Sequence, residues 1–185
     1  MQGFNVNKTK TLNAALYVLN HLGETDSHKI FKILYFADQE HLKQFGRPIT
    51  GDSYQATKLG PVPSFLYGLF KAAEKGVHPF AEAIEMFTAF SVSRKDNIPH
   101  IQATKAADIN ELAETDLEVI TNSIKANKEL SFAELVIKSH DIAWINAAKK
   151  HDTEISYIDM AIAANTSHVM INHIVLNAEN ECSKN

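Results

Sequence analysis

Asp38 occupies a position where a charged side chain needs a chemical explanation. In the segment YFADQEHLKQFGRPITG it shares a helical face with Leu42, and upstream with Phe31 and Leu34, because these residues are spaced three or four apart. A carboxylate on an apolar face needs hydrogen-bond donors, because an unpaired buried charge is strongly destabilising. One interpretation is a structural group that ties the RPITGD segment to the helix, with His41 or the amides of that segment as donors. The other is a catalytic acid or base, which would need a second reactive partner that no motif supplies.

The remaining groups that could bind a metal or perform chemistry do not form a known motif. None of the nine histidines lies in an HExxH pattern, and His168 and His173 are five residues apart, which points them away from each other on a helix. His140 and Asp141 are the best pair, but SHDIAW is an amphipathic setting that favours a core histidine. The segment LGPVP is not a phosphate loop, because its prolines lack the amide donors that such a loop needs. The residues therefore predict no metal, no cofactor and no enzyme activity.

The composition predicts one folded domain over residues 1–185, located in the cytoplasm. Hydrophobic residues make up 45% of the chain and charged residues 22%, which is ordinary for a globular protein. The net charge of -4 and the pI of about 6.1 argue against a general affinity for nucleic acid or anionic membranes. Cys182 is the only cysteine, so no internal disulfide can form, and the first residues lack the apolar run of a signal peptide. No segment is apolar over the ~20 residues of a membrane span.

Apolar residues repeat mainly with the period of a helix. Three stripes, each followed by a glycine that favours a helix end, predict helices over residues 12–22, 27–45 and 63–75. Two further helices are expected in the tail, over residues 156–164 and 166–179. The last of these is expected to pack its apolar face on the domain, although the same face, if exposed, would suit a partner groove.

Side chains near the expected helix starts predict how those starts are capped. Ser27 is the expected N-cap of the second helix, and Pro63 suits the first turn of the third. In a capping box, a hydroxyl and a carboxylate three residues apart satisfy opposite backbone donors. Two pairs have this spacing: Thr115 with Glu118, and Ser131 with Glu134.

One region has the alternating pattern of strands instead. MFTAFSVS, RKDN and IPHIQAT read as two short strands around a polar turn, with Pro99 at an edge or a strand start because it has no N–H to donate. Because an isolated hairpin is marginal in water, either SYQATK adds a third strand or the hairpin packs on a helix. The expected fold class is therefore α+β, predominantly α-helical, with a small antiparallel hairpin or sheet.

Several sequence elements, taken in order, resemble the signature of the SocA-like antitoxin family, the Panacea domain. The first half of the match is KILYFADQEHLKQFGRPITGDSYQATKLGPVPSFLY, in which the matching residues are Lys32, Tyr35, Phe36, Ala37, Asp38, Gly46, Pro48, Ile49, Thr50, Ala56, Gly60, Pro61, Val62, Pro63 and Tyr67. The second half is LAETDLEVI and SHDIAWINA, the latter with Ser139, His140 and Trp144. The resemblance covers roughly residues 10–165 and leaves residues 166–185 as a final helix and short tail.

The resemblance implies a non-catalytic antitoxin that binds and neutralises a cognate toxin protein, in some members by delivering it to a protease. No cofactor and no membrane partner are expected, and the acidic net charge disfavours a nucleic-acid partner. The motif residues, Asp38 among them, are then expected to be mainly structural. Loops carry function on rigid scaffolds, so the candidate toxin-binding residues lie in the GDSYQATKLGPVP loop and the hairpin tip: Asp52, Tyr54, Lys58, Arg94, Lys95 and Asp96.

Two alternatives to the antitoxin function remain open. The first is a small hydrolase or a ligand-binding regulator that uses a pocket near Asp38 and His41. The second is a phage-associated accessory protein, which would need a DNA contact that the acidic chain disfavours.

Overall fold

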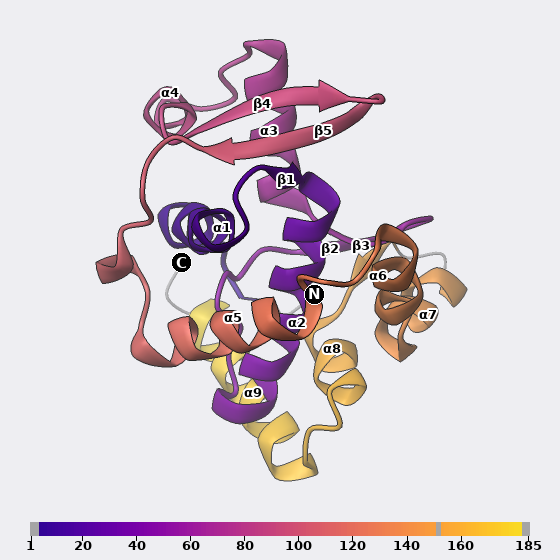
Figure 1. Ribbon diagram of the computed structural model, residues 1–185. Coiled ribbons are helices and arrows are strands. Elements are labelled where there is room, and N and C mark those ends of the chain that lie inside the picture. The colour runs from indigo at the N-terminus through magenta and orange to yellow at the C-terminus, as the bar shows by residue number, and fades with distance from the viewer. Residues whose placement is uncertain (1–3, 151–152, 183–185) are drawn as a thin grey trace.

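Helix α2 (Ser27–Phe45) crosses the middle of the molecule and is its most buried element. A computed structural model describes residues 4–150 and 153–182, with side chains up to residue 180. Figure 1 shows the β4–β5 hairpin beyond the first turns of α2 and the last helix, α9, beside its end. Twelve α2 side chains are buried, because α2 packs against α1, α5, α6, α8 and α9 on different sides.

The fold is α+β and predominantly helical, as the sequence predicts, with two small three-stranded antiparallel sheets in its described part. Besides α2, the elements in chain order are α1 (Lys8–Leu22), β1 (Thr25–Asp26), β2 (Tyr54–Thr57), β3 (Gly60–Pro63), α3 (Ser64–Lys75), α4 (Ala83–Phe87), β4 (Phe90–Lys95), β5 (Ile98–Ala103), a 3₁₀ turn η1 (Ile109–Glu111), α5 (Glu114–Asn127), α6 (Phe132–Ser139), α7 (Ile142–Lys149), β6 (Glu154–Ile155), α8 (Tyr157–Ala163) and α9 (His168–Cys182).

The expected hairpin forms the first sheet, whose strand order is β1-β5-β4. Its turn consists of Asp96 and Asn97, both with positive φ (49° and 64°), the backbone pattern of the tight turns that match strand twist. Pro99 lies beyond the two residues of β5 that pair with β1, so its missing N–H interrupts no pairing there. The third strand is β1, however, and not SYQATK.

The segment SYQATK belongs to a second sheet, whose order is β3-β2-β6. Its partner is GPVP, which forms the edge strand β3 before α3 begins at Ser64. Two prolines are tolerated in β3 because an edge strand needs donors on one side only. GPVP is therefore a strand as well as the lead-in to a helix, which the sequence patterns did not indicate.

Three glycines end helices where expected, and one of the two expected capping boxes forms. Gly23, Gly46 and Gly76 follow α1, α2 and α3. At α6, the Glu134 carboxylate accepts from the Ser131 N–H at 2.8 Å, and the Ser131 hydroxyl accepts from the Glu134 N–H at 3.3 Å.

Two capping predictions are wrong. Thr115 does not cap α5, because the N-cap is Ala113, two residues earlier, and the Asp116 carboxylate accepts from the Ala113 N–H at 2.8 Å. Ser27 does not cap α2, because Asp26 precedes it and its carboxylate accepts from the Lys29 N–H at 2.8 Å. At α2 the Asp26 carboxylate thus takes the role assigned to the Ser27 hydroxyl, and at α5 Asp116 takes the role assigned to Glu118.

The interior consists of two apolar clusters that share α2. The larger one lies among α1, α2, α3, α5 and β5, and the smaller one brings α2 together with α7, α8 and α9. Helix α9 packs through Ile174 and Ala178, while Val169 (82% exposed) and Leu176 (57%) face away from the domain. The side chain of Cys182 lies outside the described residues.

Candidate functional site

Asp38 lies in the interior and ties α2 to the segment that follows it. Its Oδ1 accepts from the N–H groups of Ile49 (2.7 Å) and Thr50 (3.1 Å), and its Oδ2 accepts from the hydroxyls of Thr50 (2.7 Å) and Tyr54 (2.8 Å). Burial raises the pKa of the Asp38 carboxyl, and these donors oppose the rise because they favour the carboxylate. The contacts support the structural interpretation of Asp38, with amides of RPITGD among the donors.

His41 does not donate to Asp38. Its Nδ1 lies 2.8 Å from the carbonyl oxygen of Arg47, and its Nε2 lies 3.1 Å from Oδ1 of Asp116. The side chains of Asp38 and His41 are both fully buried. A pocket that uses the two together, as the hydrolase alternative requires, receives no support from this geometry.

The buried carboxylate of Asp116 contacts three basic side chains, a cluster that the sequence patterns did not reveal. Besides His41, its carboxylate contacts the Lys10 ammonium (2.6 Å) and the Arg47 guanidinium (3.1 Å). Burial alone would raise the pKa of Asp116, but the hydrogen bonds from His41 and Lys10 outweigh it and hold that pKa well below its usual range. The one local signal is its position three residues after the N-cap Ala113, because its charged partners are remote in the sequence.

Asp52 and Tyr54 are not exposed, so their assignment to a toxin-binding surface is corrected. Each residue is 1% exposed. The Asp52 carboxylate accepts from the N–H groups of Phe65 (2.8 Å) and Leu66 (3.0 Å) at the start of α3, and the Tyr54 hydroxyl donates to Asp38. Burial raises the pKa of Asp52 to about 6, although the α3 amides act in the opposite direction. Both side chains hold the loop in place from the inside.

Lys32 is buried without a carboxylate partner among the described residues. Its ammonium donates to the carbonyl oxygen of Pro61 in β3 at 2.7 Å, and its side chain is 0% exposed. Burial lowers the pKa of Lys32 to about 7. The Lys32 side chain therefore holds β3 against α2 through this hydrogen bond, but burying its ammonium costs solvation free energy.

Replacing Gly60 by alanine should destabilise the protein by about 2 kcal/mol or more, because the residue has a positive φ and no room for a side chain. Its φ is 92°, and an added Cβ would lie 2.4 Å from Ser139 Oγ and 2.8 Å from Lys32 Nζ. Gly68 in α3 is the matched control, because nothing lies within 4 Å of a Cβ added there. Gly68→Ala should stabilise by about 0.5–1 kcal/mol. Urea unfolding of both variants checks the pair, and equal shifts would contradict the expected crowding at Gly60.

The motif aromatics connect α2 and α7 to their neighbours. The Tyr35 hydroxyl lies 3.0–3.1 Å from both carboxylate oxygens of Asp141, the residue that caps α7. The His140 ring stacks on Trp144 at 3.9 Å, and the Trp144 indole N–H donates to the carbonyl oxygen of Thr57 in β2 at 2.8 Å. His140 and Asp141 therefore contact different partners: His140 stacks on Trp144, and Asp141 caps α7 and accepts from Tyr35.

The other motif residues also contribute to the packing around α2, although Tyr67 and Val62 reach the surface. Gly46 ends α2 in the left-handed conformation, and the Phe36 ring packs edge-on against Tyr35 with 5.6 Å between ring centroids. Four residues are buried or half-buried at the chain segments beside α2: Pro48, Pro61, Val62 and Pro63. Tyr67 is 46% exposed.

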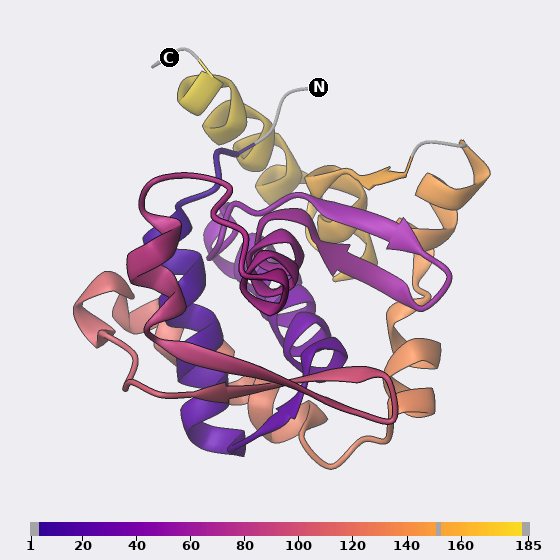
Figure 2. The ribbon, with the colours of Figure 1, turned by 90° about the horizontal axis from the view of Figure 1, so that it is seen from above.

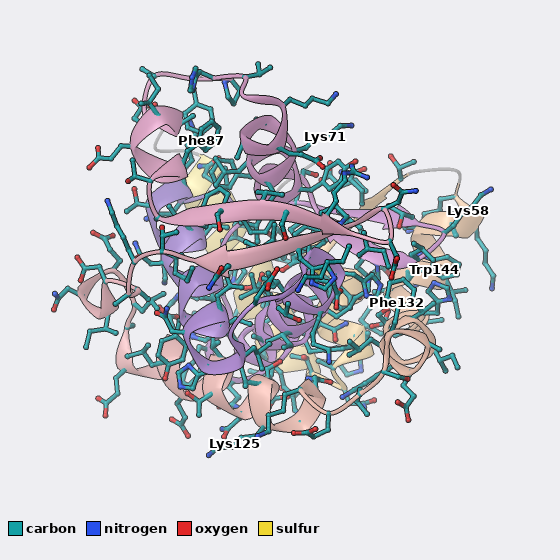
Figure 3. All side chains as sticks on the ribbon, turned by 45° about the horizontal axis from the view of Figure 1, so that its top comes forward. Lys58, Lys71, Phe87, Lys125, Phe132 and Trp144 are labelled. Carbon is teal, nitrogen blue, oxygen red and sulfur yellow. The ribbon has the colours of Figure 1, made fainter. Side chains whose placement is uncertain are left out.

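Tyr67 lines a groove of about 640 Å³. The start of α2, the β2–β3 hairpin, α3, the tip of the β4–β5 hairpin and the start of α6 form its walls. Figure 2 shows both hairpin tips reaching toward the same side of the molecule, and Figure 3 shows Lys58, Trp144 and Phe132 on one side. The large apolar side chains that line the groove are Phe31, Leu59, Val62, Tyr67, Ile98 and Phe132.

The four remaining candidate toxin-binding residues are exposed and lie close in the chain to residues that line this groove. Lys58 precedes Leu59 of the groove wall, and Arg94, Lys95 and Asp96 precede Asn97, which also lines it. Two of them already have partners: Arg94 forms an ion pair with Glu74, and the Lys95 ammonium lies 2.9 Å from the Glu24 carboxylate. The structure thus brings the two loops suggested by the sequence to a single surface feature that the sequence did not reveal.

Among the described residues, no group of three or more His, Cys, Asp or Glu side chains is placed to hold a metal ion. Within the same ranges, no helix has the length and hydrophobicity that a bilayer crossing requires.

Comparison with protein families gives one match. The family model described as "Antitoxin SocA-like, Panacea domain" matches residues 30–145, which is more than half of the chain. Searches among curated proteins and among solved structures found no significant similarity.

Proposed function

Because the chain belongs to the SocA-like antitoxin family (Panacea domain), we propose that it is a non-catalytic antitoxin that binds and neutralises a toxin protein encoded next to it. The family membership carries the proposal. Three polar motif residues add support, because Lys32, Tyr35 and Asp38 each make internal hydrogen bonds that connect parts of the fold. The proposed unit is residues 1–185, acting in the cytoplasm.

Co-expression with the adjacent toxic reading frame tests this function. Growth should be restored when the antitoxin is induced together with the toxin. Toxicity that persists at full antitoxin expression would overturn the proposal. The toxin is neutralised either by direct binding or by delivery to a protease. Repeating the assay in a strain without its main ATP-dependent protease separates the two, because only rescue by direct binding persists in that strain.

The antitoxin should be folded before it meets the toxin. Antitoxin segments that fold on binding are rich in charge and poor in apolar residues, whereas this chain buries two apolar clusters that share one helix. Hydrogen exchange of the free protein should therefore show broad amide protection in α1, α2 and α5 and one cooperative thermal transition. A chain that gains most of its protection only when the toxin is added would contradict this.

A further inference from the structure

The groove beside Tyr67 combines an apolar lining with an exposed apolar rim. None of its lining residues is a lysine, an arginine or a carboxylate. Four large apolar side chains from four separate elements are exposed around it: Leu59 (50%), Tyr67 (46%), Ile98 (41%) and Phe132 (41%). Exposed apolar side chains scattered singly are normal, but a group around a concavity marks an interaction site. The lining suits an apolar side chain of another molecule.

A basic ridge continues from this groove along α3. A smaller pocket of about 120 Å³ shares Phe31 and Tyr67 with the groove and adds Lys71, Glu74, Lys75 and Arg94. Tyr67, Lys71 and Lys75 are spaced four residues apart, so they share one face of α3. Arg94 forms an ion pair with the Glu74 carboxylate. Among the described residues, neither Lys71 nor Lys75 has a carboxylate within ion-pair distance. The ridge therefore favours a negative charge on whatever occupies the groove.

The wall of the groove also contains a buried hydrogen-bond acceptor without a donor. His28 is 8% exposed, and its Nε2 lies 3.1 Å from the carbonyl oxygen of Leu59, so Nε2 carries the proton and Nδ1 is left as an acceptor. No group in the described part of the chain donates to Nδ1. The exposed Phe132 ring stacks on the imidazole with 4.1 Å between ring centroids, and both residues line the groove. An N–H or O–H of a bound segment would satisfy Nδ1.

We propose that this groove binds an extended segment of the toxin that presents an apolar side chain, with a carboxylate two to four residues away. One turn of α3 from Tyr67 to Lys71 spans about 6 Å, which is about two residues of extended chain, and Lys75 lies one turn further. The apolar side chain occupies the groove, its backbone N–H donates to His28, and the carboxylate pairs with Lys71 or Lys75. This inference deepens the proposed antitoxin function and depends on it.

Affinity measurements with the adjacent-frame toxin, purified as an inactive variant, test the groove. Leu59→Asp and Ile98→Asp should each weaken binding at least about tenfold, because each places a carboxylate in the apolar site. Ile84→Asp is the matched control, since Ile84 is 58% exposed on α4, away from the groove. All three positions are exposed enough for the variants to fold, which thermal unfolding verifies.

Charge reversal tests the ridge. Lys71→Glu should weaken binding and reduce its dependence on salt, whereas Lys125→Glu on α5 should leave both unchanged, because Lys71 and Lys125 lie at opposite ends of the molecule in Figure 3. Overlapping synthetic peptides of the toxin should contain a binder with an apolar residue two to four positions from Asp or Glu. Replacing that acid by its amide should weaken the binder and make its affinity less sensitive to Lys71→Glu.

The outcomes separate this inference from the function on which it depends. If the unaltered protein neither binds nor neutralises the toxin, the antitoxin proposal itself fails. If it binds and the groove variants bind equally well, the toxin occupies another surface and the groove assignment is overturned. If the groove variants change only self-association, measured by light scattering over a range of concentrations, the occupant is a second copy of the chain and the assignment is again overturned.

Discussion

Asp38→Asn should lower the free energy of unfolding by about 3 kcal/mol, because an amide cannot accept from all the donors that surround the carboxylate. The Asp38 carboxylate receives two backbone N–H groups and two hydroxyls, all of them buried. Whichever carboxylate oxygen the amide nitrogen of asparagine replaces, the two donors that oxygen receives would lose their acceptor. Because the contacts link α2 to the start of the second sheet, loosening is expected across residues 49–54.

Urea unfolding measures this loss, and Asp96→Asn is the control. Asp96 has an exposed side chain at the hairpin turn with φ of 49°, a conformation that asparagine also adopts, so its substitution should change stability by less than about 0.5 kcal/mol. If Asp38→Asn instead unfolds like the unaltered protein but no longer protects against the toxin, the carboxylate acts at a functional site and its structural interpretation is wrong.

The local parts of the fold could be predicted from the sequence because their signals are contained within a few residues. The glycines that end three helices, the Ser131–Glu134 capping box and the Asp96–Asn97 turn all depend on neighbouring side chains or on backbone conformations that few residues adopt. The structural interpretation of Asp38 also came from spacing, since its amide donors lie just after the helix that carries it.

Features that depend on distant partners could not be predicted. Asp52 and Tyr54 lie in a polar stretch that is typical of a solvated loop. In the structure, Asp52 accepts from the first amides of α3, and the Tyr54 hydroxyl donates to Asp38. The two prolines of GPVP favour a stiff turn, and only its antiparallel pairing with β2 identifies the segment as a strand. The groove likewise exists only because segments from five parts of the chain meet, so no sequence window contains its pattern.

Lys32→Met should raise the free energy of unfolding near neutral pH by a few kcal/mol, because it removes a buried ammonium without a counter-charge. The pKa of Lys32 is about 7 in the folded protein, against an ordinary value of 10.5. Between these two values the unfolded chain binds the proton and the folded chain does not, so the stability of the unaltered protein rises with pH. From pH 7 to pH 9 this one group should add about 2 kcal/mol, and the methionine variant should lack that increase.

Urea unfolding at pH 7 and pH 9 tests the expectation, with Lys125→Met as a control because Lys125 is an exposed lysine on α5. The control should follow the pH dependence of the unaltered protein, while Lys32→Met should be more stable at pH 7 and show a smaller rise. The gain should come with a loss of function, because Lys32 holds the Pro61 carbonyl of β3, and the turn between β2 and β3 places Leu59 at the groove. We therefore expect weaker toxin binding by this more stable variant. A variant that follows the unaltered protein at both pH values would show that the ammonium keeps its ordinary pKa and that burial at this position carries no penalty.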